Sequence, residues 1–282
     1  MEIIAELGST WWRPNANKAK DALLKSIESA REVGATAVKL QLWNADKLYS
    51  AERAKAQWER ARLYQFPSGW LPFVKETVEG FGLSLWASVF DVDTAKEAIQ
   101  YLSAIKIASG DLTNLELIKS VHELAKANRV KFAMSTGAST DNEIRKALDL
   151  VEKPYLFQCV SAYPAVPSDY NLNVMRGPTF RFASNKVGLS DHTYGSELAK
   201  VAVGCGYTLF EKHFRLNDTL QDNPDWKVST SPLEFQAYAV AIRTAAKMLG
   251  DGVKLPVETE MAERFWARRG LDGLRPKENA DS

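Results

Sequence analysis

Cysteine is scarce in this chain, and the two that occur, Cys159 and Cys205, cannot form a disulfide framework. Both sit in apolar segments, which is typical of buried thiols in a reducing compartment, so we expect no disulfide. No stretch approaches the ~18 consecutive apolar residues of a membrane span. The first residues, MEIIAELG, lack the charged region and cleavage site of a signal peptide. We therefore expect a cytoplasmic protein with no membrane partner.

Neither sign of charge is in excess, because 36 basic side chains are balanced by 35 acidic ones and the formal net charge is +1. Basic residues do not cluster with aromatic ones, so we expect no nucleic-acid partner. Apolar side chains are abundant: they make up 45% of the 282 residues, enough to fill one large core.

Short apolar runs alternate along the chain with longer segments of helical period. The predicted strands are 2–7, 37–42, 83–89, 104–108, 130–135, 155–161, 187–190 and 208–213. The predicted helices are 17–33, 70–79, 93–101, 114–127, 141–151, 196–204 and 232–249. This pattern over about 250 residues favours the α/β class and a closed (β/α)₈ TIM barrel. An open doubly wound sheet is disfavoured, because no GxGxxG turn follows the first strand.

Two segments interrupt the alternation, 48–70 and 215–231, and we expect both to be loops at the barrel mouth. The barrel is expected to span residues 1–256. The tail, 257–282, is polar after Trp266 and is expected to be partly ordered at most.

Polar side chains gather at the carboxyl ends of the predicted strands, where (β/α)₈ barrels carry their catalytic groups. Two of the chain's three histidines, His192 and His213, end neighbouring strands beside acidic residues. Two imidazoles with room for water and substrate oxygens indicate an open, Lewis-acid metal site rather than a closed structural one. We expect a divalent metal, Mn²⁺ first, with Mg²⁺ or Co²⁺ as alternatives.

Strand alternation also places Lys39 with Gln41, Ser190 with His192, and Glu211 with His213 on shared faces. Lysines and serines at the strand ends offer the charges and hydroxyl donors that bind a phosphate dianion. The set comprises Lys39, Ser88, Lys106, Ser109, Ser135 and Ser190. Any one of them could merely satisfy loop carbonyls, so the phosphate pocket is predicted from the set as a whole.

Six segments recur in the order and at the approximate spacing of a known family. They are AVKLQ at 37–41, IKIASGDLTN at 105–114, MSTGAS at 134–139, QCVSAYPA at 158–165, GLSDHTYG at 188–195 and FEKHF at 210–214. Over about residues 2–250 the chain resembles the sialic acid synthase family. The resemblance implies a (β/α)₈ enzyme that condenses phosphoenolpyruvate with an N-acylated aldehyde sugar, giving a nine-carbon 2-keto acid and phosphate.

The resemblance also implies roles for individual residues. His192 and His213 match the metal ligands. The phosphoenolpyruvate contacts match Lys39, Ser88, Lys106, Ser109, Ser135, Ser161 and Ser190. Positions near the sugar or the reacting atoms match Glu6, Gln41, Asp111, Tyr163, Glu211 and Asp225. Glu6, Asp111 and Glu211 are the catalytic candidates, and Asp111 is the candidate base, although the family has a glutamate there.

Departures from the family pattern fall at positions that the resemblance places near the sugar site. Thr10-Trp11-Trp12 stands where the family has Asn-His, and Pro224-Asp225-Trp226 stands where it has Pro-Asp-His. Tryptophans 11, 12, 43 and 226 could stack on a sugar or pack within the protein. The SAYP sequence at 161–164 leans toward the pseudaminic acid branch.

The segment ARRGLDGLRP at 267–276 resembles the family's linker to a small antifreeze-like domain, which in a swapped dimer lends an arginine to the partner's sugar site. We expect that the arginine comes from another polypeptide, such as a separate antifreeze-like protein, or that the substrate does not need it, or that the activity has drifted. A changed or reduced sugar substrate is preferred. Because the family dimerises, a homodimer is a further expectation.

Three functions therefore stay open. The preferred one is the metal-dependent condensing enzyme. A Schiff-base aldolase would need a desolvated lysine, with Lys39, Lys106 and Lys212 as candidates. The third is a non-catalytic or partner-dependent barrel subunit that binds phosphoenolpyruvate.

Overall fold

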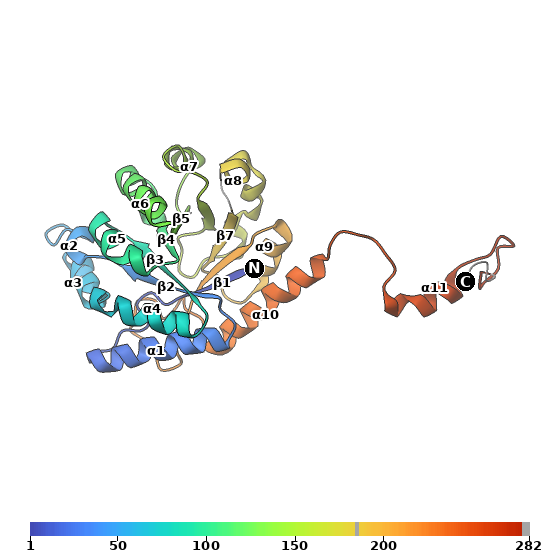
Figure 1. Ribbon diagram of the computed structural model, residues 1–282, viewed down its shortest axis with the longest axis horizontal. Helices are drawn as coiled ribbons and strands as arrows, with labels where there is room; N and C mark the ends of the chain where they lie inside the picture. The colour runs from blue at the N-terminus through green and yellow to red at the C-terminus, as the bar shows by residue number, and fades with distance from the viewer. Residues whose placement is uncertain (184–185, 278–282) are drawn as a thin grey trace. The chain divides into compact units, whose positions relative to one another are not determined.

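The computed structural model describes residues 1–183 and 186–277. Eight parallel strands close into a barrel in chain order, with helices around the outside (Figure 1), which confirms the predicted (β/α)₈ fold. The strands are β1 (Glu2–Glu6), β2 (Ala37–Leu42), β3 (Ser84–Val89), β4 (Ala104–Ile107), β5 (Lys131–Ser135), β6 (Tyr155–Cys159), β7 (Lys186–Asp191) and β8 (Leu209–His213). Each lies within two residues of its predicted range.

The helices expected from the sequence are all present. They are α1 (Ala16–Glu32), α4 (Leu71–Gly80), α5 (Val92–Ala98), α6 (Leu115–Asn128), α7 (Asp141–Leu148), α9 (Glu197–Cys205) and α10 (Pro232–Leu249). Side-chain caps fix several starts: Asn15 and Asp91 accept bonds from first-turn amides, and Thr140 forms a capping box with Glu143.

Within residues 1–183 and 186–277, four short helices were not predicted. They are α2 (Ala45–Leu48), α3 (Lys55–Tyr64), α8 (Pro178–Ala183) and α11 (Met261–Ala267). The same ranges contain 3₁₀ turns at Ser68–Trp70, Ile99–Tyr101, Ser109–Asp111, Pro167–Tyr170, Leu172–Arg176 and Glu258–Glu260.

The prediction that 48–70 is a loop is wrong, because α3 occupies much of it. Only Ala61 and Tyr64 of α3 are buried, so the helix has no apolar stripe for a periodicity argument to detect. The segment 215–231 is a loop, as expected.

The barrel interior is built in two layers. Its floor is apolar and consists of Ile4, Ala37, Trp86, Ala104, Ala133, Phe157 and Leu209. The next inward position on each strand lies two residues further on, and there stand Glu6, Lys39, Ser88, Lys106, Ser135, Cys159, Ser190 and Glu211, where Ser190 follows Gly188 on β7. A polar layer therefore rests on a dry floor at the carboxyl end of the barrel. A larger apolar core fills the space between the strands and the outer helices.

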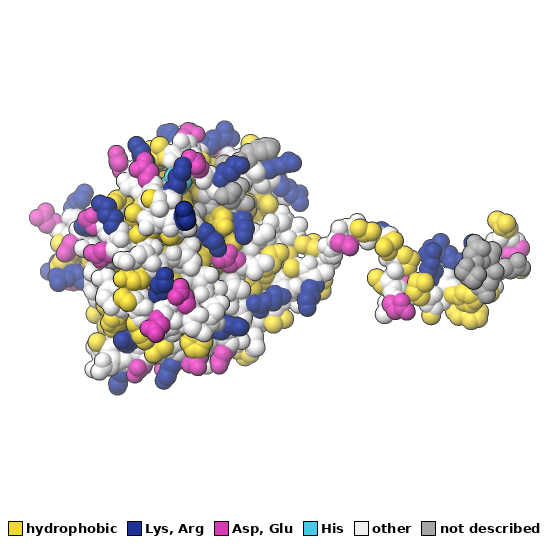
Figure 2. All heavy atoms as spheres, viewed as in Figure 1, with side chains coloured by type: hydrophobic (Ala, Val, Ile, Leu, Met, Phe, Trp, Pro, Cys, Tyr) yellow, Lys and Arg dark blue, Asp and Glu magenta, His cyan; other side chains and the backbone are white. Residues whose placement is uncertain are grey.

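The chain divides into two compact units, Met1–Ala246 and Lys247–Ser282. The second carries α11, and residues 278–282 of the predicted tail lie outside the described residues. Among the described residues, no helix has the length and apolar character needed to cross a membrane. Acidic and basic side chains are interspersed over the barrel face shown in Figure 2, in keeping with the balanced charge.

Candidate active site

The carboxyl ends of the strands surround a cavity of about 220 Å³. All but two of the site residues chosen from the sequence line it: Glu6, Lys39, Gln41, Ser88, Lys106, Ser109, Ser135, Ser161, Tyr163, Ser190, His192, Glu211 and His213. The wall also contains Phe90, Ala108, Gly110 and Cys159, which were not chosen. Cys159 could have been found, because it lies two residues beyond the inward-facing Phe157.

Two lysines and two glutamates form a buried charge network across the base of the cavity, in the polar layer of the barrel. The Lys106 ammonium lies 2.8 and 2.9 Å from the two Glu211 oxygens. Lys39 pairs with Glu6 and lies 3.8 Å from Glu211. Gln41 donates to Glu6 at 3.0 Å, and the four charged side chains are all at least 95% buried. Buried charges of this kind persist only because each has an opposite partner.

The network separates the two carboxyl groups in acidity. Burial alone would raise the pKa of Glu211, but the charges of Lys106 and Lys39 outweigh it and hold that pKa at about 2. The pKa of Glu6 is raised, because burial and the nearby Glu211 charge outweigh Lys39. Glu211 is thus the more acidic of the two carboxyl groups and Glu6 the less acidic.

Hydroxyl groups crowd the same cavity. Ser88 accepts from Lys39 at 2.9 Å, and Ser190 donates to Glu211 at 2.9 Å. Ser135 is buried, and its hydroxyl has no hydrogen-bond partner in the described part of the chain. A buried donor without a partner points to a ligand or water at that position.

Gly137 allows two of the serines to approach each other. Its amide donates to the Ser109 hydroxyl at 3.0 Å. A side-chain carbon at this position would meet the Ser161 hydroxyl at clashing distance and the Ser109 hydroxyl at 2.8 Å.

The two histidines face each other with ring centroids 5.5 Å apart, and the Tyr163 ring lies 4.2 Å from His192. Nδ1 of His192 lies 2.7 Å from the Val160 carbonyl oxygen. Since a carbonyl only accepts, Nδ1 carries the hydrogen and Nε2 keeps its lone pair in the neutral ring, as in a metal-binding histidine.

His213 is buried, and its Nδ1 has no partner among the described residues. Burial lowers its pKa to about 4, so its ring is neutral and can act as a ligand. No group of three or more His, Cys, Asp or Glu in the described ranges could hold a metal. The residues therefore fit a metal only as a two-histidine site completed by water and substrate oxygens.

Asp111 and Asp225 do not line the cavity. Asp111 is half-buried at the end of a 3₁₀ turn, and burial raises its pKa. Asp225 accepts bonds from the Ser9 amide and hydroxyl, each at 2.7 Å, and Asn223 bonds to Ser9 as well. Asp225 therefore ties the loop after β1 to the loop after β8.

The tryptophans are placed by packing. Trp11 is only 2% exposed and packs against Phe66 and Trp70, so it cannot stack on a substrate. Trp43 packs edge-on against Phe90. Trp226 lies under the Arg215 guanidinium, away from the cavity wall.

Lys212 points out of the barrel. Its ammonium donates to the Thr193 carbonyl at 2.7 Å and lies 3.2 Å from Asp191. It is therefore no candidate for a Schiff base in this cavity.

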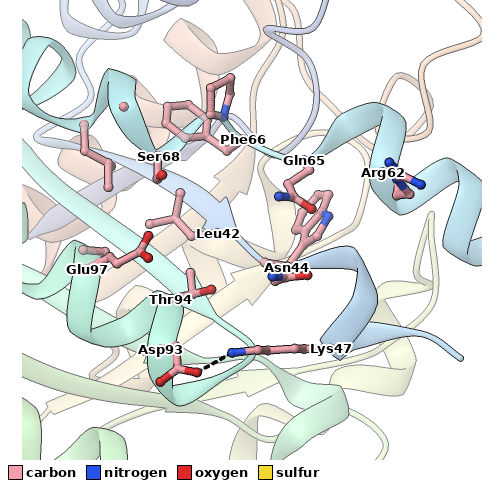
Figure 3. A pocket seen from close by; sticks show the side chains of 15 residues that line it. Leu42, Asn44, Lys47, Arg62, Gln65, Phe66, Ser68, Asp93, Thr94 and Glu97 are labelled. Atoms are coloured by element: carbon pink, nitrogen blue, oxygen red, sulfur yellow. Dashed lines mark hydrogen bonds and ion pairs between the residues drawn. The ribbon is translucent and has the colours of Figure 1, made fainter.

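A larger pocket of about 620 Å³ lies beside α2, α3 and α5 (Figure 3). Lys47 reaches Asp93 across it, and Arg62 and Glu97 stand on opposite walls. No buried polar side-chain atom of the described lining lacks a partner. We assign the chemistry to the smaller strand-end cavity because the charged and unpartnered groups converge there.

Known proteins resemble this chain over most of its length. It is 30% identical to the N,N'-diacetyllegionaminic acid synthase of Legionella pneumophila, over 95% of this chain and 79% of that protein. It is also 30% identical to a pseudaminic acid synthase of Campylobacter jejuni, over 94% and 80%. The N-acetylneuraminic acid synthetase of Leptospira borgpetersenii superposes with a TM-score of 0.80 at 27% identity, covering 93% of this chain and 89% of that one.

The pattern of the NeuB family matches residues 26–254, which include every strand from β2 to β8. The family match, the relatives and the barrel agree with the sequence motifs. The chain belongs to the NeuB family and is an enzyme of the sialic acid synthase type.

Proposed function

We propose that this barrel condenses phosphoenolpyruvate with an N-acylated aldehyde sugar in a divalent-metal-dependent reaction that yields a nine-carbon 2-keto sugar acid and phosphate. The observation that carries the proposal is the convergence of two lysines, five serines and two histidines on one strand-end cavity. The synthase relatives support the same chemistry.

Charge balance supports phosphoenolpyruvate as the ligand of the cavity floor. The pKa of Glu6 is raised, and a proton taken up by Glu6 would leave the charges of Lys39 and Lys106 against the single negative charge of Glu211. The cluster then has a net positive charge, which attracts a carboxylate and a phosphate. The unpartnered Ser135 hydroxyl is a free donor for a phosphate oxygen.

His192 and His213 would hold the divalent cation, and Mn²⁺ is the ion to test first. When bound, the cation supplies Lewis-acid polarisation of the sugar's aldehyde oxygen. Tyr163 stacks against His192 and orients that ring, while the Val160 carbonyl fixes its tautomer.

Proton transfer falls to Glu6. Carbon–carbon bond formation turns the aldehyde oxygen into a hydroxyl, and Glu6 in its protonated form can supply that proton. The resulting carboxylate can then take a proton from the water that adds at C2 before phosphate leaves. Gln41 and the Gly8 amide, each bonded to Glu6, hold the carboxyl group in place.

The second part of the proposal is the class of aldehyde sugar that the enzyme uses. A legionaminic and a pseudaminic acid synthase are equally similar to the chain, so we propose a 2,4-diacetamido hexose class rather than one isomer. A cytoplasmic location, where phosphoenolpyruvate is made, fits this proposal.

The test measures phosphate release from phosphoenolpyruvate with Mn²⁺ and a panel of aldehyde sugars, including N-acetylmannosamine and 2,4-diacetamido hexoses. Mass spectrometry follows the 2-keto acid. We expect release with one sugar class, abolished in His192→Ala and His213→Ala and retained in the surface variant Glu59→Gln. Full activity in either histidine variant refutes the metal site. Tight phosphoenolpyruvate binding without turnover on any sugar favours the binding-subunit alternative.

A further inference from the structure

Two pockets in the described part of the chain are lined by residues whose buried polar atoms lack a hydrogen-bond partner. One is the active-site cavity, with Ser135 Oγ and His213 Nδ1. The other is a separate pocket of about 370 Å³ between the loops after β7 and β8 and the start of α10. Since buried polar groups are almost always satisfied, the second cluster indicates a ligand as the first does.

Arg215 and Ser229 supply the unpartnered donors of this second pocket, which we call the β7–β8 pocket. Nε of Arg215 and the hydroxyl of Ser229 are both buried without a hydrogen-bond partner, and Ser229 is 93% buried. The Tyr238 hydroxyl also lacks a bond but lies near Asp191, so the argument does not depend on it.

The Arg215 guanidinium is held ready for an anion. It stacks on the Trp226 ring with its central carbon 4.5 Å from the ring centroid. None of the ion pairs among the described residues includes Arg215. Glu234, the acid that lines the same pocket, already accepts from the Ser231 amide and hydroxyl, each at 2.7 Å. Nη1 of Arg215 donates to the Leu216 carbonyl at 3.5 Å, and the remaining donors of this stacked guanidinium, which makes no ion pair, form a planar fork for an oxyanion.

A helix terminus adds to the same field. α9 begins directly after Ser196, which lines the pocket and makes no side-chain capping bond. The amides of its first turn therefore remain available, and the positive end of the helix dipole favours an anion. Lys227 on the pocket wall gives the site an excess of positive charge over Glu234.

We propose that the β7–β8 pocket binds a small phosphate-class oxyanion through Arg215, Ser229 and the start of α9. The residues that line it are distinct from those of the active-site cavity. The pocket includes Thr193 and Trp226, the neighbours in sequence of His192 and Asp225. An anion bound there would brace the two loops that flank the active site.

The experiment titrates the full chain with inorganic phosphate, without phosphoenolpyruvate or sugar, by equilibrium dialysis and phosphorus NMR. We expect at least tenfold weaker binding at one site in Arg215→Gln and a smaller loss in Ser229→Ala. Arg62→Gln is the matched control, because Arg62 also stacks on a tryptophan, 4.8 Å from the Trp58 ring centroid, and lines the other large pocket. Binding at this site should be unchanged in Arg62→Gln.

Ser135→Ala separates the two cavities, because it alters only the active-site cavity. Phosphate binding that survives in Ser135→Ala and is lost in Arg215→Gln supports the proposal. Wild-type binding in both Arg215→Gln and Ser229→Ala overturns it, as does binding abolished by Ser135→Ala alone. Circular dichroism and melting without phosphate check that each variant folds.

A hexose 6-phosphate added as competitor distinguishes the two sources of the anion. Displacement of phosphate from the wild-type pocket identifies a phosphate ester as a ligand, and retention identifies free phosphate. Because no turnover is measured in any of these titrations, failure here leaves the proposed synthase activity untouched.

Discussion

Glu6 and Asp111 compete for the role of proton carrier, and their environments decide between them. Glu6 is buried in the cavity floor with a raised pKa, whereas Asp111 lies off the cavity wall. We expect Glu6→Gln to lower the rate of phosphate release by about 100-fold or more, the usual range for general acid–base groups. Asp111→Asn should lower the rate of phosphate release by less than about tenfold.

The kinetics of these two variants separate chemistry from binding. Glu6→Gln should lower kcat, alter the pH profile and change KM for phosphoenolpyruvate little. Asp111→Asn should keep the wild-type pH profile. The assignment is reversed if Asp111→Asn shows the larger loss in kcat.

His213 makes stability depend on pH. Its pKa is about 4 in the fold, against an ordinary value of 6.5, so the unfolded chain binds more protons between these values. Stability from this group is complete above pH 6.5 and is lost as the pH falls through 4. The shift corresponds to about 3 kcal/mol.

Urea unfolding between pH 7 and 4 with EDTA present checks this, in the wild type and in His213→Asn. The variant should lose less stability as the pH falls. His192 has a raised pKa and shifts stability in the opposite direction. Because His192 is present in both proteins, the difference between their curves reports on His213. Parallel curves for both proteins would contradict the assignment.

Residues inside strands were predictable from alternation, whereas for residues beyond the strand ends the expectation held for some, such as Ser109 and Ser161, and not for Asp111 and Asp225. Alternation along β2, β7 and β8 correctly placed the lysine, serine, glutamate and histidines in one cavity. Asp111 lies in a 3₁₀ turn, where the two-residue repeat no longer applies. Asp225 lies in a long loop, and its bonds to Ser9 come from a segment more than 200 residues away that no local pattern reveals.

Among the helices and strands, buried elements left a clear apolar pattern in the sequence and exposed ones did not. Seven of the eight strands have an apolar floor residue, β7 having Gly188 there, and all have an apolar stretch that gives a strong signal, so every strand was found. α3 is mostly exposed and polar, and was missed. It is held at its end by the packing of Tyr64 against Trp12, a contact between distant segments.

In the turn after β5, Gly137 leaves no room for a side chain beside two serines of the site. In Gly137→Ala the new carbon would meet the Ser109 and Ser161 hydroxyls. Relieving such overlap costs about 1 to 3 kcal/mol and must displace one serine. We expect phosphoenolpyruvate affinity to fall about tenfold or more, measured by calorimetry. Gly69→Ala is the control, since nothing lies within 4 Å of the carbon it adds. Unchanged affinity in Gly137→Ala would show that Ser109 and Ser161 do not hold the ligand.

At the scale of the whole molecule, the barrel and the tail differ in what they bury. The apolar core of the barrel ends at Ala246. In the tail, Phe265, Trp266, Leu271 and Leu274 are all exposed. Large apolar side chains gathered in one segment are typical of an association surface, so if the chain forms the expected homodimer, the tail is the segment to test first.

A chain ending at Pro256 tests both whether the barrel is stable without the tail and whether the tail is needed for association. Because it keeps the whole core, its melting temperature should stay within about 2 °C of the full chain's. Because it loses the exposed apolar side chains, it should sediment as a monomer at concentrations where the full chain associates. Sedimentation velocity and thermal melting measure the two effects independently. Equal sedimentation of both chains would remove the tail from any assembly, whereas a lower melting temperature would mean that the tail stabilises the barrel.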